Sequence, residues 1–184
     1  MLRTRFAWTG LLLVSAGLAF AQTSAPPKDA TDVTKAEIDT VRKGTPNPSG
    51  RYDQVVKVVD IGKYNVGVAV IHQPVSGDAP PANAGSHDGI TEVYIIMSGS
   101  GTLTTGGTIL NGKHNNNALP TGPGVGGALQ GGVSRHVGPG DIVVIPPGVP
   151  HLWAKIDEAM DVLVVRPDAE HVLPAGYMNP SLKK

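Results

Sequence analysis

A series of short β-branched runs, starting near residue 54 and continuing to about residue 166, constrains the fold of this chain most strongly. Gly, Pro and Asn separate the runs, and almost no helical pattern lies between them. Many short strands divided by turn residues are typical of an antiparallel sandwich or a closed barrel. The sequence therefore predicts an all-β fold, with strands at residues 54–60, 64–72, 91–98, 101–105, 107–110, 134–137, 141–146, 151–156 and 160–166.

The segment before these runs has a different character. Residues 1–21 carry two arginines, then an apolar stretch, and end in Ala19-Phe20-Ala21, which is the pattern of a secretory signal peptide. The apolar stretch is too short for a good membrane span. We therefore expect a periplasmic or secreted protein without a membrane span.

After the expected signal peptide, residues 22–50 should form a leader with one short helix. Apolar residues recur every three to four positions between residues 31 and 43, Asp32 or Thr34 can cap the start, and Gly44 can end the helix. Residues 51–184 then form a single domain, which is a comfortable size for one core. Within this domain, the Asn- and Gly-rich residues 111–132 are predicted to be a long surface loop near one mouth of a barrel.

The composition excludes some classes of function. The chain has 15 Lys and Arg against 15 Asp and Glu, so its formal net charge at pH 7 is zero. A near-neutral chain offers no broad basic surface for nucleic acid. The sequence contains no cysteine, so no disulfide framework is available despite the expected export.

Two segments carry residues of types that can bind a metal. In 140-GDIVVIPPGVPH-151, the prolines and glycine must end a strand, and His151 follows directly after this stiff turn. In 85-GSHDGITEVYIIMSGSG-101, Glu92 comes five positions after His87. Neutral imidazole and carboxylate are good ligands for divalent Fe, Mn, Ni, Cu or Zn.

The spacing of Gly, Pro, Glu and His in these two segments resembles the two motifs of the cupin superfamily. The resemblance implies a cupin-type jelly-roll β-barrel with both motifs on neighbouring strands. It also implies a divalent transition metal held by His87, Glu92 and His151. Two departures stand out: Gly85 is found where the family usually has a second histidine, and Lys155 where it often has Asn. Two histidines and one carboxylate still make a known open metal site.

Strand alternation suggests further site residues. Tyr94 shares a face with Glu92, so it is a candidate catalytic acid or base. Trp153 and Lys155 share a face with His151 and are candidate pocket residues. His72, at the end of a predicted strand, is a candidate for an extra ligand in place of the missing histidine.

Plainer explanations remain for each residue. His151 can cap a turn by bonding to a carbonyl group, and Tyr94 and Trp153 can be packing residues.

At the level of function, two hypotheses stay open. One is a metal-dependent enzyme of dioxygenase, isomerase or lyase type that acts on a small molecule. The other is a module that binds a small molecule or a metal without catalysis. Cupin domains often pair, so a homodimer is a further expectation.

Overall fold

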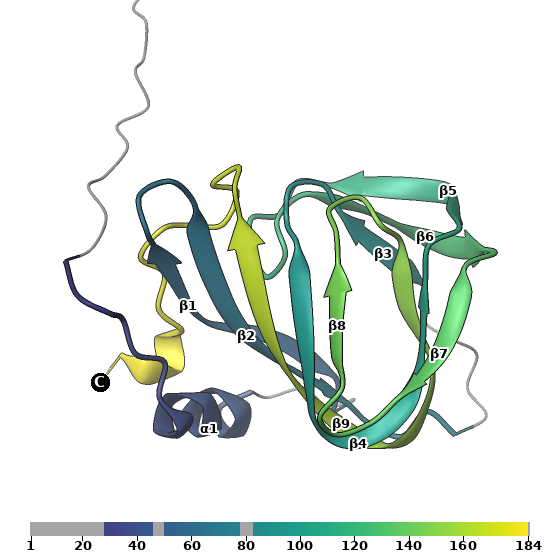
Figure 1. Ribbon diagram of the computed structural model, residues 1–184, viewed down its shortest axis with the longest axis horizontal. Coiled ribbons are helices and arrows are strands. Elements are labelled where there is room, and N and C mark those ends of the chain that lie inside the picture. Colours follow the sequence, from purple (N-terminus) through teal and green to yellow (C-terminus); the bar gives the residue numbers. More distant parts are fainter. Residues whose placement is uncertain (1–27, 46–49, 78–82, 184) are drawn as a thin grey trace, which may run out of the picture.

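The computed structural model describes residues 28–45, 50–77 and 83–183, and it shows a β-barrel with one short helix at its base (Figure 1). The predicted signal peptide lies outside the described residues. The elements are α1 (Lys35–Lys43), β1 (Tyr52–Asp60), β2 (Asn65–Gln73), β3 (Ala84–His87), β4 (Glu92–Thr105), β5 (Thr108–Asn115), β6 (Gly124–Gln130), β7 (Val133–Val137), β8 (Ile142–Ile145), β9 (His151–Asp168) and η1 (Pro180–Leu182). The predicted all-β class with a short N-terminal helix is confirmed. None of the described helices is long and apolar enough to cross a membrane.

All strand pairs are antiparallel, and two long strands join the two halves of the barrel. The first half of β4 pairs with β8 and with the second half of β9. The second half of β9 also pairs with β2, and β2 pairs with β1. The second half of β4 pairs with β7 and with the first half of β9, which leads to β3, β6 and β5. β4 and β9 therefore run through both sheets, and this arrangement closes a jelly roll.

The glycine-rich residues 98–101 bend β4 rather than ending it. Gly99 has a φ of 74°, and a Cβ there would lie 2.2 Å from the carbonyl oxygen of Ala159 on β9. Only glycine tolerates both the conformation and the contact. The two strands predicted at 91–98 and 101–105 are consequently one continuous strand with several register shifts.

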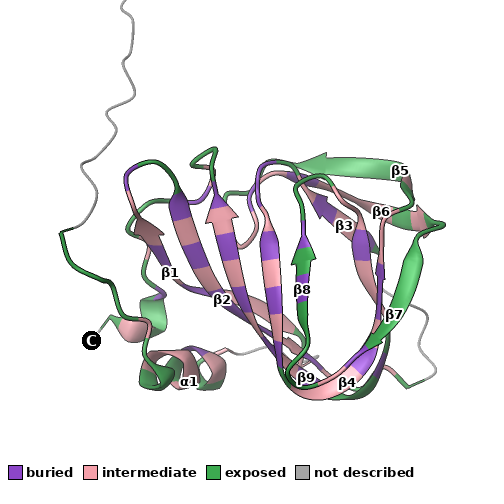
Figure 2. Ribbon diagram, viewed as in Figure 1, coloured by how far each residue is buried: buried purple, intermediate pink, exposed green. Residues whose placement is uncertain are grey.

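The core lies between the two sheets and is mostly aliphatic (Figure 2). Inward positions of β2, β9 and β4, among them Ala69, Val164 and Ile96, are completely or almost completely buried. This alternation places the residues between them on the outer side of the same sheet. Three charged side chains, Glu92, Arg166 and Asp168, are buried with the core, and each needs a partner there.

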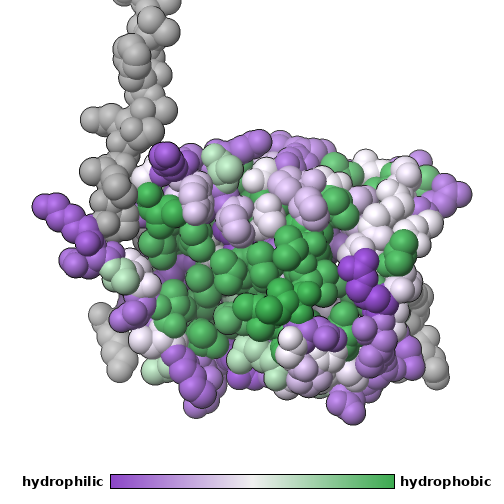
Figure 3. Space-filling view, in the orientation of Figure 1, coloured by the Kyte–Doolittle hydropathy of each residue, from purple (hydrophilic) through white to green (hydrophobic). Residues whose placement is uncertain are grey.

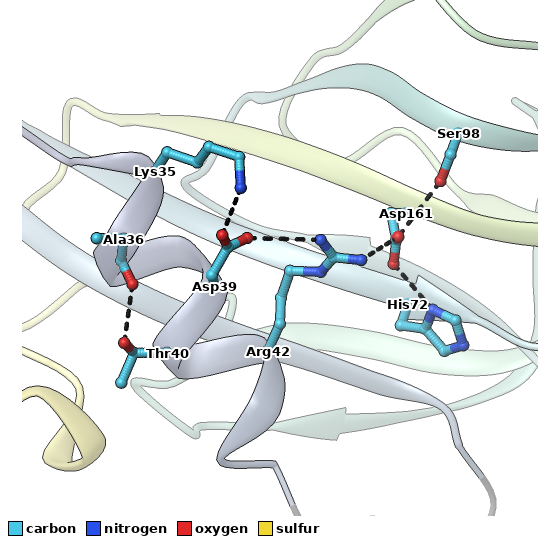
Figure 4. A network of polar contacts seen from close by, with 8 residues as sticks. All are labelled: Lys35, Ala36, Asp39, Thr40, Arg42, His72, Ser98 and Asp161. Atoms are coloured by element: carbon cyan, nitrogen blue, oxygen red, sulfur yellow. Dashed lines mark hydrogen bonds and ion pairs between the residues drawn. The ribbon is translucent and has the colours of Figure 1, made fainter.

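Helix α1 begins and ends as its sequence predicts. Thr34 caps the first turn together with Glu37, and Gly44 ends the helix. The helix packs on the outer side of β1 and β2 through Val41, which contacts a small second core. A polar network at its end joins Arg42 to Asp161 on β9 (Figure 4).

The prediction of a long loop at residues 111–132 was wrong. β5 continues to Asn115, and β6 pairs with it to form a hairpin. Nearly all of β5 is exposed and β6 is glycine-rich, so neither strand shows an alternation of apolar and polar residues. β3 was also missed, because Gly, Ser and His are weak strand formers and pairing with β6 and β9 defines it.

Candidate metal centre

The structure brings together the three residues that the two motifs supply. His87 ends β3, Glu92 begins β4 and His151 begins β9. Oε2 of Glu92 lies 3.4 Å from Nε2 of His87 and 3.2 Å from Nε2 of His151. One ligand atom from each residue lies within 4.8 Å of the other two. The three side chains thus form a candidate metal site.

The turn predicted from the prolines and glycine orients His151. β8 ends at Ile145, and the N–H of Gly148 donates to the carbonyl of His87, 2.7 Å away. Nδ1 of His151 is 3.0 Å from the carbonyl oxygen of Val149, so this nitrogen carries the proton. The turn directs Nε2 at Oε2 of Glu92, 3.2 Å away, and in the neutral imidazole Nε2 carries the lone pair that can bind a metal.

Glu92 is held by a buried arginine on the other side. Nε of Arg166 donates to Oε1 of Glu92 at 2.9 Å, and its terminal nitrogens bond to Asp53 and to the carbonyl of Pro120. The Arg166 side chain is 0% exposed and that of Glu92 is 1% exposed. Because Arg166 occupies Oε1, only Oε2 faces the two histidines.

The charges of this cluster shift the acidity of its members. Burial acts to raise the pKa of Glu92, but the charge of Arg166 and the hydrogen bonds from both histidines outweigh it and hold the pKa well below its usual value. Burial acts to lower the pKa of His151, but its contact with Glu92 raises it overall. Glu92 is therefore a permanent carboxylate at neutral pH, ready to act as a ligand.

Tyr94 and Trp153 line the same region. The Tyr94 hydroxyl donates to Oε2 of Glu92 at 3.0 Å, and its ring stacks on Trp153 with centroids 6.0 Å apart. Burial and the negative charge of Glu92 raise the pKa of Tyr94 well above its usual value. Tyr94 therefore stays protonated, and it can donate a hydrogen bond or a proton but is poorly suited to act as a base.

The metal-site residues open onto a cavity of about 660 Å³. His87, His151, Tyr94 and Trp153 form one part of its wall. Other parts come from the end of α1, from β1 and from the segment after β5. Among its polar lining residues are Arg51, Gln54 and Gln73. A cavity of this size is sufficient for a small organic ligand.

The structure places two predicted residues elsewhere. His72 lies on the outer face of β2, where its Nδ1 is 2.9 Å from Oδ1 of Asp161, and this is the network beside α1 (Figure 4). Its strand neighbour Ile71 points into the core, so His72 must point away from the site. His72 is therefore not an extra ligand in this structure.

Lys155 also points outward. A register shift on β9 opposite Thr102 and Leu103 adds a residue after Trp153, and this breaks the alternation on which the prediction relied. The Lys155 side chain is 62% exposed and pairs with Asp157. It is not among the residues that line the cavity.

Gly85 occupies the place where the resemblance predicts a further histidine. It pairs with His151 across β3 and β9 and lines the cavity. The nearest atom to a Cβ built at this position is Cε1 of His87, 4.0 Å away. A larger side chain would have room here, and its absence widens the cavity next to the ligands.

The spacing of the three donor atoms fits a divalent metal. Two atoms that are each about 2.1 Å from one ion lie about 3.0 to 3.4 Å apart when the bond angle is about 90 to 110°. The separations of 3.2 and 3.4 Å between Glu92 and the two histidines meet this requirement. Two imidazoles and one carboxylate suit a divalent transition metal, so the residues fit such an ion.

Comparisons with known proteins give structural neighbours of low sequence identity. No protein-family model and no curated protein matches this chain. A solved protein from Klebsiella pneumoniae with a double-stranded β-helix domain has a TM-score of 0.45 and 15% identity, over 77% of this chain and 93% of that chain. A DMSP lyase from Ruegeria pomeroyi has a TM-score of 0.42 and 15% identity, over 78% of this chain and 60% of the lyase.

An oxalate decarboxylase from Bacillus subtilis has a TM-score of 0.45 and 18% identity, over 67% of this chain and 27% of the enzyme. The antiparallel pairing of this chain's own strands confirms the predicted jelly roll, with both motifs on strands that meet at one site. Similarity at this level of identity concerns the fold and says nothing about the reaction.

Proposed function

We propose that this protein is exported and is a metal-dependent cupin-type enzyme that acts on a small molecule. One observation carries the proposal: Nε2 of His87, Nε2 of His151 and Oε2 of Glu92 converge at one end of a cavity of about 660 Å³. Three protein ligands leave coordination positions for a substrate or water. The reaction is of dioxygenase, isomerase or lyase type.

The residues of the chain have separate roles in this proposal. His87, Glu92 and His151 hold the ion, which when bound would polarise a substrate oxygen as a Lewis acid. Arg166 keeps Glu92 ionised and its Oε2 turned toward the histidines. Tyr94 holds a proton on its hydroxyl beside Glu92 and can donate it to a substrate atom.

The metal content of the purified protein tests this proposal. We expect wild-type protein reloaded with Fe, Mn, Ni, Cu or Zn to retain about one ion per chain, and His151→Ala to lose most of it. His136→Ala is the matched control, because the His136 side chain is 63% exposed and pairs with Asp157, away from the three ligands. If wild type and His151→Ala retain equal amounts of every metal, the proposal is wrong.

An activity screen then separates the reaction types. Oxygen consumption by the metal-loaded protein over phenols, thiols and organic acids tests the dioxygenase branch. Product analysis under nitrogen tests isomerase and lyase chemistry on the same compounds. Tyr94→Phe removes the proton donor, so it should lower turnover more than metal content.

Export can be tested separately. Protein recovered from the periplasm or the medium should begin near Gln22, as mass spectrometry of the intact chain can show. An intact N-terminus on protein found only inside the cell would contradict export, and it would leave the metal site unaffected.

A second candidate function is binding without catalysis. It is favoured by the hydrogen bonding of Glu92, since both of its oxygens have partners from Arg166, Tyr94 and the histidines without any ion. A closed network of this kind is stable as it stands. A protein that binds metal or small molecules in calorimetry, but shows no turnover in either screen, would favour this alternative.

A further inference from the structure

A buried amide in the cavity wall has no role at the metal centre. Gln73 is the last residue of β2, it lines the cavity, and it is only 7% exposed. The buried residues Ala69 and Ile71 precede it at alternate positions, so its side chain points to the inner side of the sheet. In the described part of the chain, the Gln73 amide has no hydrogen-bond partner. A buried amide needs one, and the space next to it belongs to the cavity.

A guanidinium group lies beside this amide. In the antiparallel register of β1 and β2, Tyr52 is opposite His72, so Arg51 and Gln73 form the next opposite pair. Opposite side chains of this kind have Cβ atoms about 4.5 to 5.5 Å apart. Arg51 also lines the cavity, and it has no ion pair or hydrogen bond with any described residue. Arg51 is the only Lys or Arg among the described residues of the cavity wall.

The acidic groups near the cavity do not neutralise Arg51. Asp53 lines the cavity, but its carboxylate bonds to Arg166, which also holds Glu92. One guanidinium thus faces two carboxylates, and a divalent ion at the metal centre more than neutralises the remaining negative charge. Arg51 then adds a further positive charge to the wall. A cavity of this kind attracts a negatively charged ligand.

The pair of Arg51 and Gln73 matches a carboxylate group. Guanidinium and amide N–H groups are both donors, and the two oxygens of one carboxylate can accept from both. A phosphate group carries about two negative charges near neutral pH, so Asp53 disfavours it more than a singly charged carboxylate. A neutral ligand could bond to Gln73, but it would leave Arg51 without a countercharge.

The hydrophobic side of the barrel is unsuited to such a ligand. The sheet of β4 and β8 exposes Ile142 and Val144 there, and Figure 3 shows a broad hydrophobic area in the middle of this side. Aliphatic side chains offer a small anion no hydrogen-bond donor. The cavity, with its amide and guanidinium groups, is the better place for it.

We propose that Arg51 and Gln73 form a carboxylate-binding subsite, so that the small molecule bound in the cavity is an organic acid. Its carboxylate contacts these two residues, and the rest of the molecule extends toward His87 and His151 in the same cavity. The subsite rests on the proposed function for its link to a reaction, but neither of its residues is a metal ligand. Binding can therefore be measured with and without metal.

Calorimetry with malonate as the probe tests the subsite. Wild-type protein loaded with Zn should bind malonate, and Arg51→Met should bind it at least about tenfold more weakly, because the ion pair is lost. Gln73→Glu keeps the size of the side chain but puts a carboxylate opposite Arg51, so we expect a loss of at least about tenfold there too. Arg135→Met is the control, since Arg135 is exposed on β7 and does not line the cavity.

Other probes separate the classes of ligand. Malonamide has the same carbon skeleton without charge, and it should bind to the metal-free protein at least about tenfold more weakly than malonate. Inorganic phosphate should also bind more weakly than malonate, and tighter binding of phosphate would overturn the assignment to a carboxylate. Equal binding of malonamide and malonate would overturn the subsite. The same holds if wild type binds none of malonate, succinate and glycolate at about 10 mM.

The metal content of the same samples separates this subsite from the proposed function. Protein that retains no metal but binds malonate through Arg51 contradicts the proposed function and supports the subsite. Protein that retains metal, with equal malonate affinity in wild type and Arg51→Met, contradicts the subsite alone. Circular dichroism shows whether the variants have folded. Arg51 is exposed, so Arg51→Met decides the matter even where Gln73→Glu fails to fold.

Discussion

Replacing Arg166 with Met should destabilise the protein strongly and should do so through two carboxylates. Arg166 is completely buried, and it bonds to Glu92 on one side and to Asp53 on the other. Met is similar in length but has no charge. In Arg166→Met, Glu92 is left as a buried carboxylate without its cation, and Asp53 loses its partner as well.

The size of the effect follows from the burial of these groups. Removing one partner from a buried ion pair typically costs about 3 to 5 kcal/mol, because the other charge stays desolvated. The Glu92 side chain is only 1% exposed, so the full cost applies there, whereas Asp53 is 25% exposed and adds less. We therefore expect a loss of at least about 3 kcal/mol in the free energy of unfolding, which is a large part of the stability of a typical domain.

Urea unfolding of the metal-free protein at pH 7, followed by circular dichroism, measures this loss. Arg135→Met is the matched control, since Arg135 is an exposed arginine on β7 whose side chain donates a hydrogen bond to Thr105. Exposed substitutions of this type change stability by about 0.5 kcal/mol or less. If Arg166→Met loses less than about 1 kcal/mol, or no more than Arg135→Met, the buried charge network does not support the site as we describe.

The pH dependence of the same measurement identifies the group responsible. The pKa of Glu92 lies below its usual value in the folded protein, so its ionised form stabilises the fold above the unfolded pKa, and this contribution disappears as pH falls through the folded pKa. Arg166→Met removes the main favourable charge. The difference in stability between the two proteins should therefore be largest near neutral pH and should narrow in acid, where Glu92 is protonated. A difference that does not change with pH would point to lost packing instead.

Three further predictions concern other parts of the molecule. Gly85→His should bind divalent metal at least about tenfold more tightly in calorimetry, because position 85 has room for a side chain next to the ligands; unchanged affinity would place that side chain away from the ion. Metal affinity should fall as the pH drops through the raised pKa of His151, because a protonated imidazole cannot bind a metal. Titrations in two buffers of different ionisation enthalpy can detect the protons that metal binding releases. A metal affinity that stays constant between about pH 5.5 and 8 would contradict this prediction. Gly99→Ala should lower the melting temperature far more than Gly106→Ala. Both glycines have a positive φ, but only Gly99 lies against the backbone of Ala159. Equal decreases in melting temperature would show that the close contact does not matter.

The parts of the site that could be predicted from the sequence depend on local patterns. The turn before His151 is specified by Pro and Gly within a few residues, and the burial of Glu92 and Tyr94 follows from simple alternation at the start of β4. Such patterns act over a few positions, and one sequence is sufficient to see them. For the same reason the strand-rich class could be predicted with no knowledge of the strand order.

The parts that could not be predicted depend on register or on distant partners. Lys155 was assigned to the pocket by alternation, but a bulge turns it outward. His72 was a candidate extra ligand because it ends a predicted strand, and nothing in its sequence shows which face of β2 is the inner one there. Arg166 was missed, although it follows Val162 and Val164 at a buried spacing. A charge at such a position must have a buried partner, and this is the signal that could have identified it.

The same strands also contain a signal about the outer face. In the runs VYIIM at 93–97 and IVVI at 142–145, almost every position is apolar, including those that point away from the core. Such a continuous pattern is usual for strands that are covered on both sides, and it is unusual for an antiparallel sheet with one side in water. The inward residues of these runs form the core and support Glu92, so they do not explain why the outward residues are aliphatic.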